Sequence, residues 1–106
     1  MREVANIPAE TITAPPVVIL AWHAVPDPQG SLRGYVDLQI PRWRLRLMSC
    51  AAFSNGENEW IALPSRPTGK DGKWVPLVAF DDQQTAQAFG RAAIAALDGY
   101  APRWRG

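Results

Sequence analysis

The middle of the chain alternates apolar and polar residues with a period of two. Residues 32–40 carry leucine, glycine, valine and isoleucine on one face, and polar side chains with one tyrosine on the other. The alternation resumes over 43–53, with tryptophan, leucine and phenylalanine on one face and Arg44, Arg46 and Met48 on the other. Because this period is typical of strands that bury one face, we predict two antiparallel β-strands.

A short loop of two residues, Pro41 and Arg42, would join these strands as a hairpin. Pairing Ile40 with Trp43 then brings the apolar residues of both strands to one side, and a slip of one residue would turn them outward. Neither loop residue favours the positive φ of a tight hairpin, so a longer loop remains an alternative.

A second hairpin is predicted at Asn55 and Gly56, because both residues tolerate positive φ. It leads into a third strand, in which Trp60 faces a small alanine. Two apolar residues of this third strand then lie on the second face of the sheet, where a single helix on the first face would leave them in water. We therefore expect a second copy of the chain to cover this face. The predicted dimer interface is Met48, Ile61 and Leu63.

Weaker patterns predict the flanking elements. Residues 17–25 are rich in β-forming residues and predict a first strand. Residues 74–80 predict a last strand at a sheet edge, because Pro76 has no N–H to donate. Asp81 followed by Gln84 resembles a capping box and begins a helix predicted over 81–97.

These elements predict a single α+β domain over 17–100, a curved antiparallel sheet of four to five strands followed by one C-terminal helix. Residues 1–16 are polar and proline-containing and are expected to form a disordered or loosely attached arm. Residues 64–73 are expected to be a polar loop, and 101–106 a short basic tail.

Charge is unevenly distributed along a chain whose formal net charge is only +1. Seven lysines and arginines but only four acidic residues fall within 31–79, so the predicted sheet is the basic part of the molecule. Arginines bind phosphates, and an aromatic ring among them stacks on an unpaired base. The candidate nucleic-acid-binding residues are Arg33, Tyr35, Arg44 and Arg46 on the sheet, with Arg66, Lys70 and Lys73 on the loop.

The alternative is a solvated sheet face, with Asp37 paired across the strands to Arg46. The sequence places Trp60 and Trp74 in the core, whereas Trp43 fits either the core or a stacking role.

No residues in the sequence suggest catalysis, a metal site or a cofactor. His23 lies alone in an apolar segment, and Lys70 lacks the glycine spacing of a phosphate-binding loop. Cys50 is the single cysteine, which excludes an intrachain disulfide and is consistent with a reducing cytoplasm. We expect a cytoplasmic protein that is not an enzyme, with no signal peptide or membrane span.

The segment EWIALPSRPTGKDGKWVPLVAF resembles part of the stage V sporulation protein G family, the septation regulators of bacteria. In that family a strand ends in an apolar-Pro-Ser triplet, followed by a basic loop with an aspartate-glycine pair. The positions that match are Leu63, Pro64, Ser65, Asp71 and Gly72. Similar small phage and bacterial proteins combine these features with a terminal helix, and the likeness covers roughly 33–100.

That family is similar in layout to the single-stranded-DNA-binding fold of Whirly proteins and the positive-cofactor coactivator. The resemblance implies a dimer that binds nucleic acid on a basic sheet surface. The septation regulators contact DNA near the terminal helix, where this chain has only Arg91 among its bases, so we place the site on the sheet and loop.

The sequence thus predicts a homodimer or larger oligomer that binds nucleic acid, with single-stranded DNA favoured over RNA or duplex and little sequence preference. Two alternatives remain open. One is a non-catalytic protein-interaction module, and the other is a duplex-DNA-binding transcriptional regulator.

Overall fold

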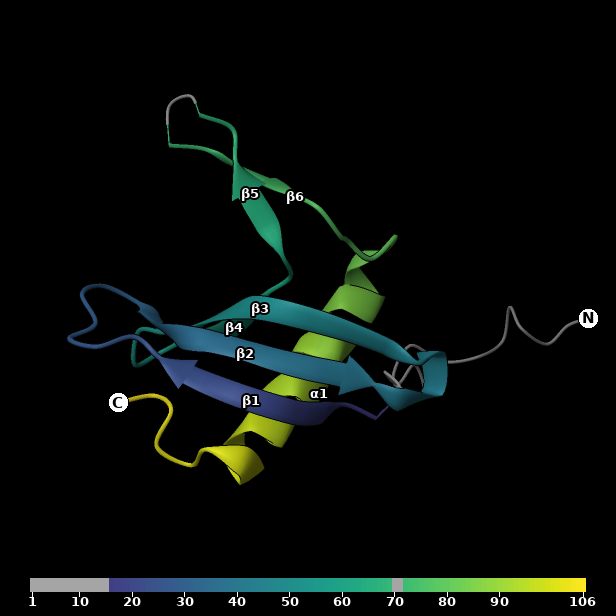
Figure 1. Ribbon diagram of the computed structural model, residues 1–106, viewed down its shortest axis with the longest axis horizontal. Helices are drawn as coiled ribbons and strands as arrows, with labels where there is room; N and C mark the ends of the chain where they lie inside the picture. The colour runs from purple at the N-terminus through teal and green to yellow at the C-terminus, as the bar shows by residue number, and fades with distance from the viewer. Residues whose placement is uncertain (1–15, 70–71) are drawn as a thin grey trace, which may run out of the picture.

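The computed structural model describes residues 16–69 and 72–106 and confirms an α+β fold (Figure 1). Four antiparallel strands form the main sheet in the order β1-β2-β3-β4, and one helix, α1, crosses behind it. A separate two-stranded hairpin, β5–β6, projects from the sheet. The elements are β1 (Val18–Ala24), β2 (Leu32–Ile40), a 3-10 helix (Pro41–Trp43), β3 (Leu45–Ser54), β4 (Glu59–Ala62), β5 (Ser65–Pro67), β6 (Trp74–Pro76) and α1 (Gln83–Tyr100).

The turn between β2 and β3 is longer than the predicted two-residue loop. One turn of 3-10 helix is followed by Arg44 in the left-handed region, at φ 52°, whose N–H donates to the Pro41 carbonyl at 3.0 Å. Ile40 consequently pairs with Leu45 rather than with Trp43. The predicted register was wrong by two residues, because the 3-10 turn uses residues that the prediction assigned to the strand.

A β-bulge in β3 reverses the faces predicted for the second half of that strand. Leu38 pairs with Leu47, but Val36 pairs with Cys50, which leaves an extra residue between the two pairs. Ser49 has φ 57° at this point, and its N–H donates to the Asp37 carboxylate at 2.8 Å. After the bulge, Cys50 and Ala52 are buried, whereas Ala51 and Phe53 face the opposite side, contrary to the predicted alternation.

The turn between β3 and β4 is also longer than predicted. The Asn55 side chain accepts the backbone N–H groups of Glu57 and Asn58, at 3.0 and 2.7 Å, and so holds a four-residue turn. Phe53 therefore pairs with Trp60, and their rings stack with centroids 5.0 Å apart. The predicted pairing of Trp60 with an alanine was wrong, again by two residues.

The longer turn also changes the environment of the predicted dimer interface. Ile61 pairs with the buried Ala52, and both Ile61 and Leu63 pack against the core as half-buried residues. Met48 is separate from them and 49 % exposed. Because the core already covers part of Ile61 and Leu63, their exposure no longer argues for a second copy of the chain.

The core lies between the sheet and α1. Val36, Leu38, Ile40 and Leu47 contribute the sheet side. From the helix, the buried residues are Ala88, Phe89, Ala93 and Leu97.

The ends of α1 differ slightly from the prediction. The N-cap is Asp82 rather than Asp81, and its carboxylate accepts the Thr85 N–H at 2.7 Å. The helix continues to Tyr100, three residues beyond the predicted end at Leu97, and passes through Gly99.

The C-terminal segment, predicted as a basic tail, folds back onto the domain. Trp104 is buried and packs edge-on against Trp22 of β1, with ring centroids 6.2 Å apart. Arg105 forms a bidentate ion pair with Glu59 of β4 and a second with Asp98 of α1. The segment therefore links the sheet to the helix.

The hairpin β5–β6 replaces the predicted last strand of the sheet. Ser65, in the stretch predicted as a loop, pairs with Pro76, so both strands leave the main sheet. A backbone bond from Leu77 to the Pro64 carbonyl, at 3.0 Å, closes the base of the hairpin. The expectation of an N-terminal arm over 1–16 falls almost entirely outside the described residues.

Candidate functional site

Among the described residues, α1 covers one face of the main sheet and leaves the other face open (Figure 1). Side chains of directly paired residues lie on the same face. Tyr35 pairs with Ala51, Ala51 with Ala62, and Phe53 with Trp60. These residues, together with Met48 and Ser49, define what we call the open face.

A cavity of about 430 Å³ lies between the open face and the β5–β6 hairpin. The sheet contributes Tyr35, Phe53 and Trp60 to its lining, and the hairpin contributes Trp74. Smaller side chains complete the wall. A pocket of this size is within the range that accommodates small ligands or a single heterocyclic base.

The aromatic residues around this cavity remain accessible to solvent. Tyr35 is 40 % exposed, Trp60 42 % and Trp74 64 %. The prediction that Trp60 and Trp74 belong to the core was therefore wrong. The bulge in β3 and the separation of the hairpin turn both rings toward solvent.

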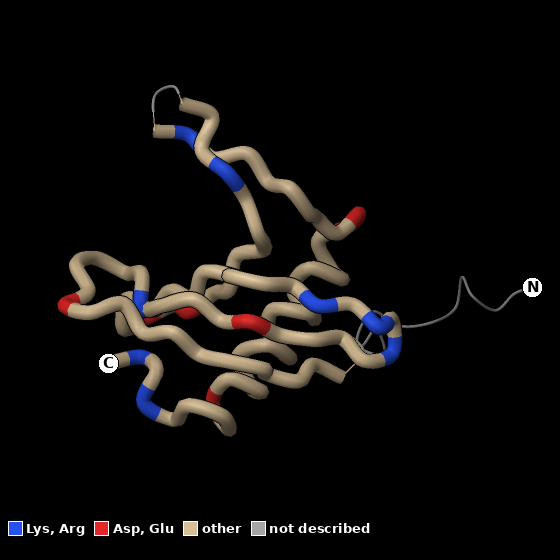
Figure 2. The backbone as a smooth tube through the Cα atoms, in the orientation of Figure 1, with Lys and Arg blue, Asp and Glu red and all other residues tan. Residues whose placement is uncertain are grey.

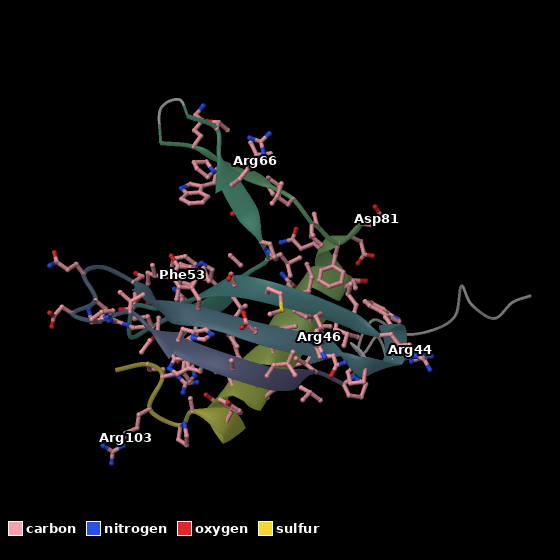
Figure 3. The ribbon with its side chains drawn as sticks, in the orientation of Figure 1. Arg44, Arg46, Phe53, Arg66, Asp81 and Arg103 are labelled. Atoms are coloured by element: carbon pink, nitrogen blue, oxygen red, sulfur yellow. The ribbon has the colours of Figure 1, made fainter. Side chains whose placement is uncertain are left out.

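The basic residues predicted to act together are divided among three places (Figures 2 and 3). Arg44 and Arg46 lie at the β2–β3 turn, and both are exposed. Arg66 and Lys73 lie on the projecting hairpin and are also exposed. Lys70 lies outside the described residues.

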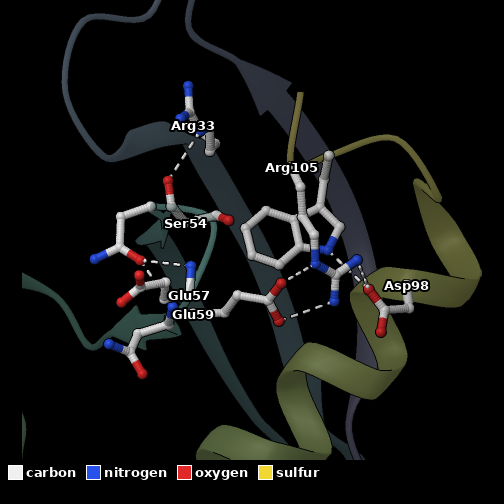
Figure 4. Close-up of polar contacts among 9 residues, drawn as sticks. Arg33, Ser54, Glu57, Glu59, Asp98 and Arg105 are labelled. Carbon is white, nitrogen blue, oxygen red and sulfur yellow. Dashed lines mark hydrogen bonds and ion pairs between the residues drawn. The ribbon is translucent and has the colours of Figure 1, made fainter.

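Arg33 lies near the β3–β4 turn, and it is half-buried. Its Nε donates to the Ser54 carbonyl at 3.2 Å (Figure 4). Arg33 shares β2 with Tyr35, and Arg66 shares β5 with Ser65; both Tyr35 and Ser65 line the cavity.

Asp37 is the acidic side chain on the strand that crosses the middle of the open face. Its carboxylate accepts the Ser49 N–H at 2.8 Å and lies 3.3 Å from the His23 ring. Arg46 pairs instead with Gln39, so the ion pair between Asp37 and Arg46 that belongs to the alternative of a solvated sheet face does not form. The side chain of Asp37 is only 15 % exposed, which limits its contact with a ligand.

A larger cavity, about 580 Å³, opens on the helix side between β4 and the start of α1. Three carboxylates, Glu59, Asp81 and Asp82, line it, together with the single base Arg91. A polyanion would be repelled there, so this cavity is a poor site for nucleic acid.

Cys50 has a structural environment. Burial, with a smaller contribution from Asp37, raises the pKa of its thiol to about 12, and its Sγ contacts the Leu47 carbonyl at 3.8 Å. Within 16–69 and 72–106, no three His, Cys, Asp or Glu side chains are grouped as metal ligands would be. Over the same ranges, no helix has both the length and the apolar character needed to cross a membrane.

The sequence identified Tyr35 but not three other residues that line the cavity, Phe53, Trp60 and Trp74. The sequence indicated these residues only as aromatic residues in strands that also carry polar residues. The prediction placed Phe53 on the wrong face because the alternation of apolar and polar residues does not indicate the bulge at Ser49.

Comparison of the chain with protein-family models found no match. Comparisons with curated proteins and with solved structures found none either. The resemblance to the septation regulators is therefore still a prediction from one short motif.

Proposed function

We propose that this protein binds single-stranded nucleic acid, DNA in preference to RNA or duplex, with little sequence preference. We further propose that it acts in the cytoplasm as a homodimer or larger oligomer. The observation that carries the proposal is the cavity on the open face, surrounded by the exposed rings of Tyr35, Trp60 and Trp74.

Stacking explains why such a surface suits an unpaired strand. Every base has a π-face, so aromatic rings bind bases without reading their sequence, at about 1–3 kcal/mol per base. Trp60 is held by its stack on Phe53, which keeps one ring oriented before a ligand arrives. In duplex DNA the same base faces are hidden within the helix, so the site favours single strands.

Cations near the cavity would contact the phosphates. Arg66 and Lys73 extend from the hairpin, and Lys70 belongs to the same segment. Arg33 uses its Nε for the Ser54 carbonyl, and its two terminal nitrogens have no described partner. These bases give the site a charge complementary to a nucleic-acid backbone.

The test is a fluorescence-anisotropy titration of labelled single-stranded DNA at low and moderate salt. We expect binding that weakens as salt rises, because cations released from the DNA drive association. Trp74→Ala should reduce the binding free energy by about 1–3 kcal/mol, the value of one stacked base. Trp74 is mostly exposed, so the variant should retain its thermal stability.

Two matched variants distinguish stacking from loss of apolar surface. Trp74→Phe retains a ring and should bind more tightly than Trp74→Ala. Leu77→Ala removes an apolar side chain that is 58 % exposed beside the hairpin but does not line the cavity, so it should leave binding unchanged. If unaltered protein does not bind any single strand at low salt, the proposal is wrong.

One observation favours a protein-interaction module as the second candidate. The open face also exposes Met48, at 49 %, and apolar patches of this kind mark protein interfaces. This candidate predicts binding to a protein partner that is insensitive to salt, and no binding of single-stranded DNA. A competition between single-stranded and duplex DNA separates the main proposal from a duplex-binding transcriptional regulator resembling the septation family.

A further inference from the structure

The β2–β3 turn carries several exposed cationic and apolar side chains that do not line the cavity. Arg42, Arg44 and Arg46 alternate there with Trp43 and Leu45, and all five residues are exposed. Trp43 is 49 % exposed and Leu45 40 %. No residue in the described ranges forms an ion pair with any of the three arginines. We call residues 42–46 the arginine tip.

Backbone structure holds the arginine tip in a defined conformation. The 3-10 turn positions Pro41 to Trp43, and the Arg44 N–H closes it through the 3.0 Å bond to the Pro41 carbonyl. Arg46 then lies in β3, paired with Gln39. A tip that is ordered in this way loses less conformational entropy on binding than a flexible loop would.

The arginine tip and the cavity lie toward opposite ends of β3 (Figure 3). Arg46 is near the start of the strand, and Phe53, which lines the cavity, is near its end. Phe53 lies seven residues after Arg46, which corresponds to about 23 Å along a strand. The near wall of the cavity, at Ser49, lies closer to the tip. Between Arg46 and the cavity the open face presents Met48, which is uncharged, and the carboxylate of Asp37, whose side chain is 15 % exposed.

We propose that the arginine tip is a second contact site for the same single strand, an inference that rests on the proposed function. The three arginines bind phosphates and Trp43 stacks on a base, while the cavity holds bases further along the strand. A strand stacked at about 3.4 Å per nucleotide needs about seven nucleotides to span this distance. Shorter strands reach only one of the two sites.

The experiment measures affinity for labelled oligothymidylates of about 4 to 16 nucleotides, the range of site sizes on small single-strand-binding folds. The variant carries Arg42→Gln, Arg44→Asn and Arg46→Gln together. Asparagine is chosen at position 44 because it tolerates the positive φ found there. We expect equal affinity for the shortest strands and at least a tenfold loss for the longest. The salt slope for the long strands should fall by about 2, at about 0.7 for each lost phosphate contact.

Control variants locate the effect. Arg91→Gln removes one cation from the helix side and should change nothing at any length. Trp74→Ala should weaken binding at every length, because the cavity contributes to all complexes. Circular dichroism melting of each variant establishes that it is folded before its affinity is compared.

Each remaining outcome is informative. If the triple arginine variant binds strands of every length more weakly by the same factor, or binds none of them more weakly, the two-site arrangement is wrong. The proposal of single-strand binding would stand in both cases. No binding by the unaltered protein at any length would instead overturn the proposed function. If the arginine tip binds vesicles of phosphatidylglycerol and the long oligonucleotides show no length effect, the tip is a membrane contact and the inference is wrong.

Discussion

Gly34 lies in β2 under the indole ring of Trp22, where two strands approach closely. A Cβ at this position would lie 2.5 Å from the His23 carbonyl oxygen and 2.6 Å from the Trp22 ring. Trp22 in turn packs on the buried Trp104, so the indole has little freedom to move away. The absence of a side chain at Gly34 therefore permits the contact between β1 and the C-terminal segment.

We expect Gly34→Ala to lower the free energy of unfolding by about 1–3 kcal/mol, the usual cost of overpacking. Urea denaturation of the variant measures this directly. Gly90→Ala is the matched control, because a Cβ there meets nothing within 4 Å and α1 continues through it. That substitution should stabilise the protein by about 0.5–1 kcal/mol. Equal stability of the two variants would contradict the close contact at Gly34.

The C-terminal segment acts at the scale of elements, because Arg105 joins β4 to α1. One guanidinium Nη lies 2.9 Å from Glu59 and another 2.7 Å from Asp98 (Figure 4). Trp104 strengthens the arrangement by donating its indole N–H to Asp98 at 2.9 Å. The hydrogen bonds from Arg105 hold the pKa values of both carboxyl groups below their ordinary range.

This arrangement predicts a pH dependence of stability. A carboxyl group with a lowered pKa in the folded state favours folding above its unfolded pKa, and this contribution disappears as pH falls through the folded pKa. Glu59 and Asp98 should thus contribute fully above about pH 5 and begin to lose their contribution as the pH falls below about 4. Arg105→Gln should cost about 1 kcal/mol of unfolding free energy at pH 6, because the pairs are partly exposed.

The difference between Arg105→Gln and the unaltered protein should become smaller as pH falls from 6 to 3. Urea denaturation at several pH values measures it. The pKa of Asp82, lowered by its N-cap bonds from Thr85, contributes equally in both proteins and cancels. A difference that is independent of pH would show that Arg105 acts through packing on Trp104, above whose ring its guanidinium lies.

The helix side and the open face of the molecule differ in the charges that lie around them. The helix side collects carboxylates around its cavity, whereas the tip and hairpin that border the open face carry exposed bases (Figure 2). Asp37 is the exception, because it carries a negative charge between the cavity and the arginine tip. Its structural role is to hold the bulge through the Ser49 N–H.

The substitution Asp37→Asn removes the negative charge but keeps a side-chain oxygen for the structural role. The amide oxygen can still accept the Ser49 N–H, so the bulge and the fold should remain. Removing the negative charge should tighten single-strand binding several-fold at low salt and less at high salt, as screening requires. Asp37→Ala is the companion variant and should lower the free energy of unfolding by about 1–2 kcal/mol, because the Ser49 N–H loses its acceptor. Unchanged binding by Asp37→Asn at low salt would show that the strand does not cross this region.

The sequence by itself determined the kinds of elements in the main sheet and the helix, and their order. Alternation over 32–40, the turn residues after Ser54 and the helical spacing after Asp82 are local signals, so β2, β3, β4 and α1 could be predicted. Buried positions such as Val36 and Leu97 followed from the same periods. These features depend on residues close together in the chain, which is why pattern alone was sufficient.

Only the tertiary structure decided which side chains share a surface. The register of three strands is set by Arg44 in the left-handed region, by the Asn55 side chain and by the hydrogen bond from Ser49 to Asp37. The alternation of apolar and polar residues in the sequence indicates none of these three features. The hairpin and Arg105 depend on partners distant in sequence. Faces of a sheet alternate every residue, so one bulge was enough to move Phe53 to the open face, where the longer turn at Asn55 pairs it with Trp60.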